Sequence, residues 1–447
     1  MQVLADRSLF TMFSAINWWT TWASLAAVPA HGGVVVFILA PVTKEYPAGY
    51  KQRPPDAILK ICLGQPHFPS ECFRERLRGN ILYNNQNTAR RHSPVFVVGC
   101  HRSGTNLLYD TLLSAGGFAV YRGYLPVYKM LIPRFGSLNS LANRNRLMKT
   151  WLRSKGFRRS GLDPQLLTEA VLRECRSGGD FICITMDQVA CNQNVERWAL
   201  YDPDNVLFIP QIKADIPSAL FVHIIRDGRD IALSLKAMGG FQPLPWDRGP
   251  RSLQATALYW EWMVRKGRQH GRSVPSDYLE IHYEDLVLNP QRALTALSEF
   301  LDQELDYDRI QATSLGRIRK SNSSFLAERD PKPRSPVNRW KARLTHQEIA
   351  ALETVIGECL EEHGYSLTTG PEERTATGRE KRMQYLYARF LDTKLWLKTR
   401  TPLGRLANLS TLELADPEEF DPPDPSESNS EDTLHTEDQT VRSTVRD

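Results

Sequence analysis

Short apolar runs alternate with amphipathic segments between residues 94 and 368. Three runs are rich in β-branched or aromatic residues and end at turn-forming or polar positions, as buried strands do: PVFVVG (94–99), ALFVHII (219–225) and YLEIHY (278–283). Helical spacing of apolar residues predicts helices over 106–113, 230–238, 257–269, 291–301 and 346–363. Strands alternating with helices are typical of a parallel sheet covered on both faces. The pattern therefore predicts an α/β domain over 94–368.

The N-terminal extension, residues 1–93, has a different pattern. No charged residue occurs in 8–43, and a Pro-rich connector follows it. The segment 8–43 is long enough to span a membrane, but polar residues, Pro29 and a glycine pair interrupt it. A helical membrane anchor or interfacial segment and a partly buried extension are therefore equal alternatives. If the segment spans, the basic residues after it place the main domain in the cytoplasm.

The C-terminal part divides into a helical extension and a tail. Residues 369–410 contain a basic amphipathic helix over 380–399, for which packing against the core is favoured over binding to a membrane surface. Residues 411–447 are acidic and rich in Pro and Ser, which predicts a disordered tail.

Composition narrows the function classes. The chain has 447 residues and a net charge of +5, but the tail carries 12 acidic and two basic residues, so the remainder is strongly basic and suits an anionic partner. No helix-turn-helix or finger pattern occurs, which argues against nucleic acid. The seven cysteines are scattered without zinc-like spacing. We expect reduced thiols, no metal, and a cytoplasmic protein, with membrane association left open.

The segment PVFVVGCHRSGTNLLYDTLL (94–113) carries the sharpest chemical signal. A strand ends at Gly99, a short loop follows, and a helix opens after Gly104. Such a strand–loop–helix element points backbone N–H groups and a helix N-terminus at an anion. The spacing is P-loop-like, but Thr105 stands where nucleoside-triphosphate P-loops have Lys, and the nearest cation is Arg102. A P-loop kinase is therefore the weaker interpretation.

A second anion site is predicted in FVHIIRDGRDIALSL (221–235). Arg226 follows the strand directly, and Ser234 lies on the next helix, so a guanidinium and a hydroxyl could hold one phosphate. The other charges of the RDGRD turn, Asp227, Arg229 and Asp230, are interpreted as mostly solvated turn and capping residues. Two anion sites at strand ends suit a nucleotide with phosphates at both ends.

The two motifs, in this order, resemble the sulfotransferase family that uses 3'-phosphoadenosine 5'-phosphosulfate (PAPS). The resemblance covers about 95–367 and includes YLEIHYEDLVLNPQRALTALSEFL (278–301), NSSF (322–325) and SPVNRWKARLT (335–345). It is closest to bacterial sulfotransferase-like proteins and tyrosylprotein sulfotransferases. It implies in-line transfer of a sulfuryl group to a hydroxyl or amine, with 3',5'-bisphosphoadenosine (PAP) as product and no metal. The acceptor, a carbohydrate, peptide or small molecule, is not identified.

The resemblance also implies roles for individual residues. Arg102 would stabilise the charge that develops during transfer, while Arg226 and Ser234 would bind the 3'-phosphate. The implied cofactor-binding residues are Arg102, Ser103, Gly104, Thr105, Asn106, Arg226, Ser234, Tyr283, Ser323, Ser324, Arg339 and Lys341.

The general base is where the chain departs from the family pattern. Residues 119–131 lack the acidic residue expected of the base, with Tyr124 near its place. His101, Tyr124 and Asp187 are the candidates, and Tyr124 would need a pKa well below about 10. A family member that binds the nucleotide at a membrane but is catalytically weak or inactive is the alternative function.

Overall fold

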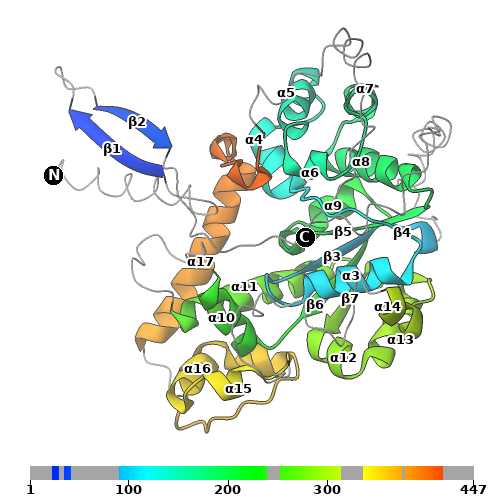
Figure 1. The fold of residues 1–447 in the computed structure, drawn as a ribbon. Helices are drawn as coiled ribbons and strands as arrows, with labels where there is room; N and C mark the ends of the chain where they lie inside the picture. Colours follow the sequence, from blue (N-terminus) through cyan, green and yellow to red (C-terminus); the bar gives the residue numbers. More distant parts are fainter. Residues whose placement is uncertain are drawn as a thin grey trace, which may run out of the picture.

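The computed structural model describes residues 23–29, 35–41, 90–238, 252–313, 336–374 and 378–415. Figure 1 shows a central sheet with helices on both sides. The sheet has five parallel strands in the order β4 (Phe118–Ala119), β5 (Arg197–Tyr201), β3 (Val95–Gly99), β6 (Leu220–Ile225) and β7 (Tyr278–His282). The predicted α/β class and the three predicted strands are confirmed. The sequence pattern missed β4 and β5.

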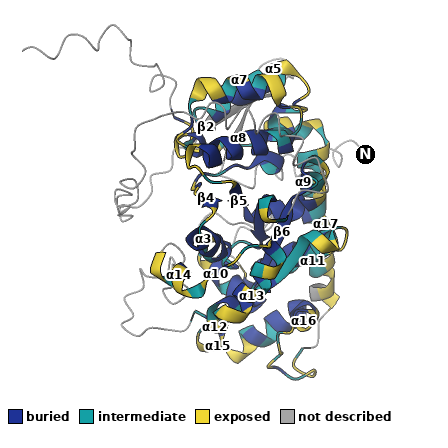
Figure 2. Cartoon of the chain, turned by 90° about the vertical axis from the view of Figure 1, so that its right-hand side faces the viewer, coloured by how far each residue is buried: buried dark blue, intermediate teal, exposed yellow. Residues whose placement is uncertain are grey.

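The alternation of side chains along β3 explains the two helical layers. Val95 and Val97 point into one core, which includes side chains of α3 (Thr105–Ala115), α12 (Tyr283–Leu288), α13 (Pro290–Leu301) and α14 (Tyr307–Thr313). Phe96 and Val98 point into the other and larger core. The helices contributing to it include α8 (Gly178–Asn192), α9 (Ile209–Asp215), α10 (Gly228–Ala237), α11 (Leu253–Gly271), α16 (His346–Glu362) and α17 (Gly378–Arg400). Figure 2 shows the buried strands between exposed outer helix faces.

The remaining helical elements complete the domain. They are η3 (Arg90–His92), η4 (Val127–Leu131), α4 (Ile132–Phe135), α5 (Leu141–Trp151), α6 (Lys155–Arg158), α7 (Pro164–Glu174), η5 (Pro203–Leu207), η6 (Pro275–Asp277), α15 (Trp340–Arg343), η8 (Pro402–Leu406) and η9 (Ser410–Leu412). A capping box begins α16, because Thr345 Oγ1 accepts from Glu348 N and the Glu348 carboxylate accepts from Thr345 N.

The helix predicted near the C-terminus is α17, and it packs against the core as expected. Tyr387 and Leu391 are buried on its inner face. On α11, the Trp262 indole N–H donates to Asp392 Oδ1 at 2.9 Å and Lys266 pairs with the same carboxylate at 3.0 Å. These contacts fix α17 along α11 (Figure 1).

The two ends of the chain depart from prediction. In the N-terminal extension, β1 (Ala23–Pro29) and β2 (Val35–Pro41) pair antiparallel, so the predicted helical character does not apply to these residues. Their apolar, β-branched runs favour strands. At the other end, Ala415 N donates to Arg153 O at 2.9 Å, so the predicted disordered tail cannot begin at 411. Residues 416–447 lie outside the described residues. No helix in the described ranges is long and apolar enough to cross a membrane.

Candidate functional site

The strand order places the predicted motifs next to one another. In a parallel sheet all carboxyl ends meet at one edge, and β5, β3, β6 and β7 are consecutive neighbours there. The residues that follow these strands are Asp202, Cys100, Arg226 and Tyr283 respectively. Ligands of such sheets bind at this edge, where the strand order switches direction. The site therefore extends as a row from the β5 end to the β7 end.

The loop between β3 and α3 has the backbone of an anion cradle. Gly104 precedes α3 with φ 100°, and Arg102 also has a positive φ, 74°. A Cβ at Gly104 would lie 2.4 Å from Cδ2 of Tyr283, so only glycine fits. Ser103 is fully buried, and among the described residues its Oγ has no hydrogen-bond partner. A buried hydroxyl without a partner, beside a helix N-terminus, fits an anionic ligand.

The two predicted motifs meet at Arg102. Its Nε donates to Ser234 Oγ on α10 at 2.9 Å, and its carbonyl oxygen accepts from Arg226 Nη1 at 3.5 Å. Arg102, Arg226 and Ser234 are therefore brought together from β3, β6 and α10. The implied roles of Arg102 and Ser234 at opposite ends of one nucleotide remain predictions, because in this structure the two side chains bond to each other.

Arg226 is held in place by its neighbours. Its guanidinium lies 4.3 Å above the Tyr283 ring, and its Nη2 donates to Pro336 O at 2.7 Å and to Asp230 Oδ2 at 3.2 Å. Its buried Nε has no partner within the described part of the chain. This is a second donor that an anion could satisfy.

In the RDGRD turn, the structure contradicts the prediction that the charged side chains are mostly solvated. Asp227, Arg229 and Asp230 are buried rather than solvated. Arg229 pairs with Asp227 at 2.8 Å and with Glu353 of α16 at 2.5 Å, and its guanidinium lies 3.8 Å from the Trp340 ring. The expected cap is nevertheless present, since Asp227 Oδ1 accepts from Arg229 N. The turn is a structural anchor beneath the site.

The remaining predicted cofactor-binding residues differ in how far they are buried. Thr105 is buried at the start of α3 and Asn106 is exposed in its first turn. Arg339 precedes α15, and the exposed Lys341 has its Nζ 5.4 Å from the Trp340 ring. The predicted Ser323–Ser324 contacts fall outside the described residues.

The three candidate bases have different surroundings. Nε2 of His101 lies 3.3 Å from Asp204 Oδ2, and its side chain is about one-third exposed at 32%. Burial, with Asp202 close by, raises the pKa of Tyr124, which opposes the shift a base would need. Asp187 is buried, and its Oδ1 accepts from the indole N–H of Trp198 at 2.8 Å. The surroundings favour His101.

Sequence reasoning missed an acidic pair beside His101. Asp202 and Asp204 follow β5, and Asp204 also forms an ion pair with Lys129 of η4. Burial, reinforced by Asp204, raises the pKa of Asp202 to about 6. Burial alone would raise the pKa of Asp204 too, but Lys129 and His101 hold it below its ordinary value. The signal was the position of YDPD at a strand end, which is visible only once β5 is recognised.

Parts of this chain are similar to known sulfotransferases. The model of the Sulfotransferase family matches residues 94–307. A search of curated proteins gave no match. Among solved structures, the sulfotransferase domain of the Synechococcus PCC 7002 olefin synthase is 16% identical with TM-score 0.41, and covers 62% of this chain and 96% of that one.

Two further solved structures are similar at the same level. A sulfotransferase of Mycobacterium avium is 16% identical with TM-score 0.34, and the match covers 66% of this chain and 82% of that protein. A mouse sulfotransferase complexed with PAP is 14% identical with TM-score 0.33, and the match covers 66% of this chain and 95% of that protein. The family match includes both anion-binding motifs and the strand ends that carry them. Residues 94–307, which form most of the α/β domain, thus constitute a domain of the sulfotransferase family.

Proposed function

We propose that this protein transfers a sulfuryl group from PAPS to a hydroxyl or amine of an acceptor. One observation carries the proposal, namely the convergence of Arg102, Ser234 and Arg226 at the carboxyl ends of adjacent strands. The family match and the motif order support the choice of sulfotransfer over phosphotransfer, since Thr105 stands where a kinase needs Lys.

The residues present fit the nucleotide on two counts. The buried Ser103 Oγ and Arg226 Nε lack partners within the described ranges, and phosphate oxygens would satisfy both. Arg226 and Ser234 would hold the 3'-phosphate, and the cradle from Ser103 to Asn106 would hold the 5' side. Tyr283 supports the Arg226 guanidinium from one face. PAPS would supply the sulfuryl group itself.

The protein's contribution to transfer is positioning and electrostatics. Arg102 is permanently charged and lies in the cradle, so it would stabilise negative charge developing on the transferred group. His101 precedes it, and the contact of its Nε2 with Asp204 Oδ2 at 3.3 Å orients the imidazole. His101 would accept the proton of the acceptor hydroxyl. Asp204 acts as the positioning residue for His101.

The test is titration calorimetry with PAP on the wild type and on Arg102→Ala and Arg226→Ala. Loss of a charge-assisted contact is worth about 1.5–3 kcal/mol, or roughly 10- to 150-fold in Kd. Arg265→Ala is the matched control, because Arg265 is an arginine of α11 paired with Glu261 and 40% exposed. Ordinary PAP affinity in both site variants would refute the assignment.

Turnover then separates the proposal from its alternative. PAPS should be converted to PAP when acceptors are present, and His101→Ala should lower kcat while PAP affinity stays near the wild-type value. A protein that binds PAP but converts no phenol, alcohol, amine, carbohydrate or peptide would be the inactive family member instead. Magnesium-dependent ATP binding that excludes PAP would indicate a kinase.

A further inference from the structure

The side of α17 that faces away from the core is both basic and apolar. Nine residues between 381 and 400 are exposed, and none of them is acidic: Lys381, Arg382, Tyr385, Leu386, Ala388, Arg389, Thr393, Trp396 and Arg400. The three large apolar side chains are more than half exposed, at 60% for Tyr385, 51% for Leu386 and 56% for Trp396. We call these nine residues the outer face of α17.

Helical geometry gathers most of the outer face into one stripe. At 3.6 residues per turn, seven of the nine positions fall within an arc of about 100°, namely 382, 385, 386, 389, 393, 396 and 400. From Lys381 to Arg400 the stripe is about 28 Å long. The Arg389 guanidinium lies 5.3 Å from the Tyr385 ring, so cations and aromatic groups are interleaved along it. Such a stripe can contact an extended surface along its whole length.

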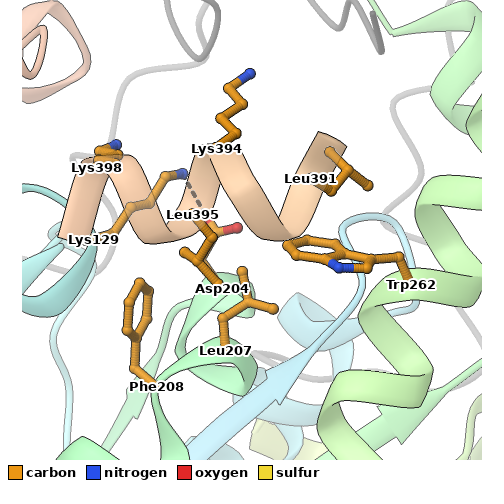
Figure 3. Close-up of a pocket in the computed structure, with 9 residues that line it drawn as sticks. All are labelled: Lys129, Asp204, Leu207, Phe208, Trp262, Leu391, Lys394, Leu395 and Lys398. Atoms are coloured by element: carbon orange, nitrogen blue, oxygen red, sulfur yellow. Dashed lines mark hydrogen bonds and ion pairs between the residues drawn. The ribbon is translucent and has the colours of Figure 1, made fainter. Parts of the chain in front are cut away.

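The opposite side of α17 is already occupied by the core. Figure 3 shows Leu391 close to Trp262 of α11, and Leu395 on the side of the helix that faces the core. Asp392 is the only acidic residue in 381–400, and it pairs with Lys266 of α11 at 3.0 Å. The helix is therefore held by one side, and its one carboxylate is engaged there rather than on the outer face.

Two further lysines of α17 lie outside the stripe. Lys394 and Lys398 are less exposed than the residues of the outer face. Burial, and then repulsion by Lys398 and Lys129, lowers the pKa of Lys394 to about 7. The positive charge of the outer face therefore comes from its three arginines and Lys381.

A membrane surface with anionic lipids complements both kinds of side chain. Basic residues are attracted to the negative surface potential of such a membrane, and Trp and Tyr rings favour the level of the lipid headgroups. A soluble polyanion could pair with the arginines, but it would leave Leu386 and Trp396 in water. Interleaved basic and apolar residues on one exposed side are typical of helices that lie in the membrane interface.

We propose that the outer face of α17 binds the surface of a membrane that contains anionic lipids, with the helix parallel to that surface. Figure 1 shows α17 (orange) along one side of the domain, so this contact leaves the packing of its inner side in place. The family match ends at residue 307, before α17 begins. The membrane contact is therefore independent of the nucleotide motifs and of the proposed function.

The experiment measures binding of the full-length protein to vesicles by flotation. Vesicles of phosphatidylcholine alone are compared with vesicles that also contain about 30% phosphatidylserine, and we expect the anionic vesicles to bind at least about 10-fold more tightly. Each basic residue near the surface contributes about 5-fold, so Arg382→Gln/Arg389→Gln should weaken binding to anionic vesicles about 25-fold. Trp396→Ala should weaken it by about 10-fold, because the ring no longer leaves water.

The control variants change charge and apolar area elsewhere on the surface. Arg292→Gln/Arg309→Gln removes two exposed arginines of α13 and α14, which cover the other face of the sheet. Leu288→Ala removes a side chain of α12 that is 59% exposed. Both controls should bind anionic vesicles as the wild type does. Equal thermal unfolding of all variants shows that they are folded.

Three results would overturn the proposal. The first is equal binding of the two kinds of vesicle by the wild type. The second is vesicle binding that survives both α17 variants, which would place the contact in another segment such as 8–43. The third is binding of soluble polyglutamate, lost in the arginine variant, together with no binding of vesicles, which would indicate an acidic protein partner. PAP affinity should be the same in the α17 variants as in the wild type, so failure of the proposed function leaves the vesicle result unaffected.

Discussion

Replacing Gly104 by alanine tests how the cradle is built. Gly104 combines φ 100° with a close approach to Tyr283, whose Cδ2 and Cε2 would lie 2.4 and 2.8 Å from an added Cβ. Ordinary carbon contacts are about 3.5–4.0 Å, so the ring must move by about 1 Å. The ring supports the Arg226 guanidinium at 4.3 Å, so its displacement also disturbs the second anion-binding residue.

The cost has two parts. A non-glycine residue in left-handed backbone costs about 1–2 kcal/mol. Overpacking against a buried ring adds about 1–3 kcal/mol. We therefore expect Gly104→Ala to lower the free energy of unfolding by about 2–5 kcal/mol. In a domain of this size each kcal/mol shifts Tm by about 2 °C, so Tm should fall by about 4–10 °C.

Gly161→Ala is the matched control. Gly161 also has a positive φ, 66°, but nothing lies within 4 Å of its added Cβ. It should show the backbone cost alone, about 1–2 kcal/mol. The additional loss in Gly104→Ala should shrink in a Tyr283→Ala background, and PAP affinity should fall only in the Gly104 variant. Equal Tm shifts in the two glycine variants, measured by scanning calorimetry, would refute this account.

Two further predictions concern buried charge. Arg229→Ala should lower the free energy of unfolding, measured by urea denaturation, by about 3–5 kcal/mol, because it removes the paired cation of the buried Asp227 and Glu353 carboxylates. Arg265→Ala, at a side chain that is 40% exposed, should cost about 1 kcal/mol or less. Similar costs for the two variants would contradict the burial argument. Lys394 has a pKa of about 7 in the folded protein and about 10.4 when unfolded, so the unfolded state binds more protons between these values and stability rises with pH there. The stability difference between wild type and Lys394→Met should therefore change between pH 6.5 and pH 9, and a constant difference would contradict the lowered pKa.

The part of the fold that could be predicted is the part encoded in local runs. VFVVG is wholly apolar and LFVHII is apolar except for His223, because β3 and β6 are central and covered on both faces. RWALY, which forms β5, begins with a buried Arg197 whose Nε donates to Ser93 O at 2.8 Å. Carbonyl groups about a hundred residues away accept hydrogen bonds from its guanidinium. The sequence pattern of the segment therefore does not predict a buried strand. The two-residue β4 is too short for any periodic signal.

Distant partners also explain the error in the RDGRD turn. Asp227 and Arg229 looked solvated because their neighbours in sequence are polar. In the structure Glu353 and Trp340, more than 100 residues later, close over them. A charged turn becomes buried only when such partners exist, and a single sequence does not show which carboxylate meets which guanidinium.

The same reasoning separates the two halves of the candidate site. The residues proposed to bind the nucleotide lie in two continuous segments of the sequence. They do so because a phosphate cradle needs a strand, a loop and a helix N-terminus in succession. The surroundings of the proposed base are assembled from Lys129 of η4 and Asp204 of η5, which carry no motif. One carboxylate oxygen of Asp204 contacts both His101 Nε2 and Lys129 Nζ. The position of Asp204 after β5 therefore ties Lys129 to the orientation of the proposed base. Replacing Lys129 should consequently act on the chemical step through Asp204, while the arginine contacts of the nucleotide half remain as they are.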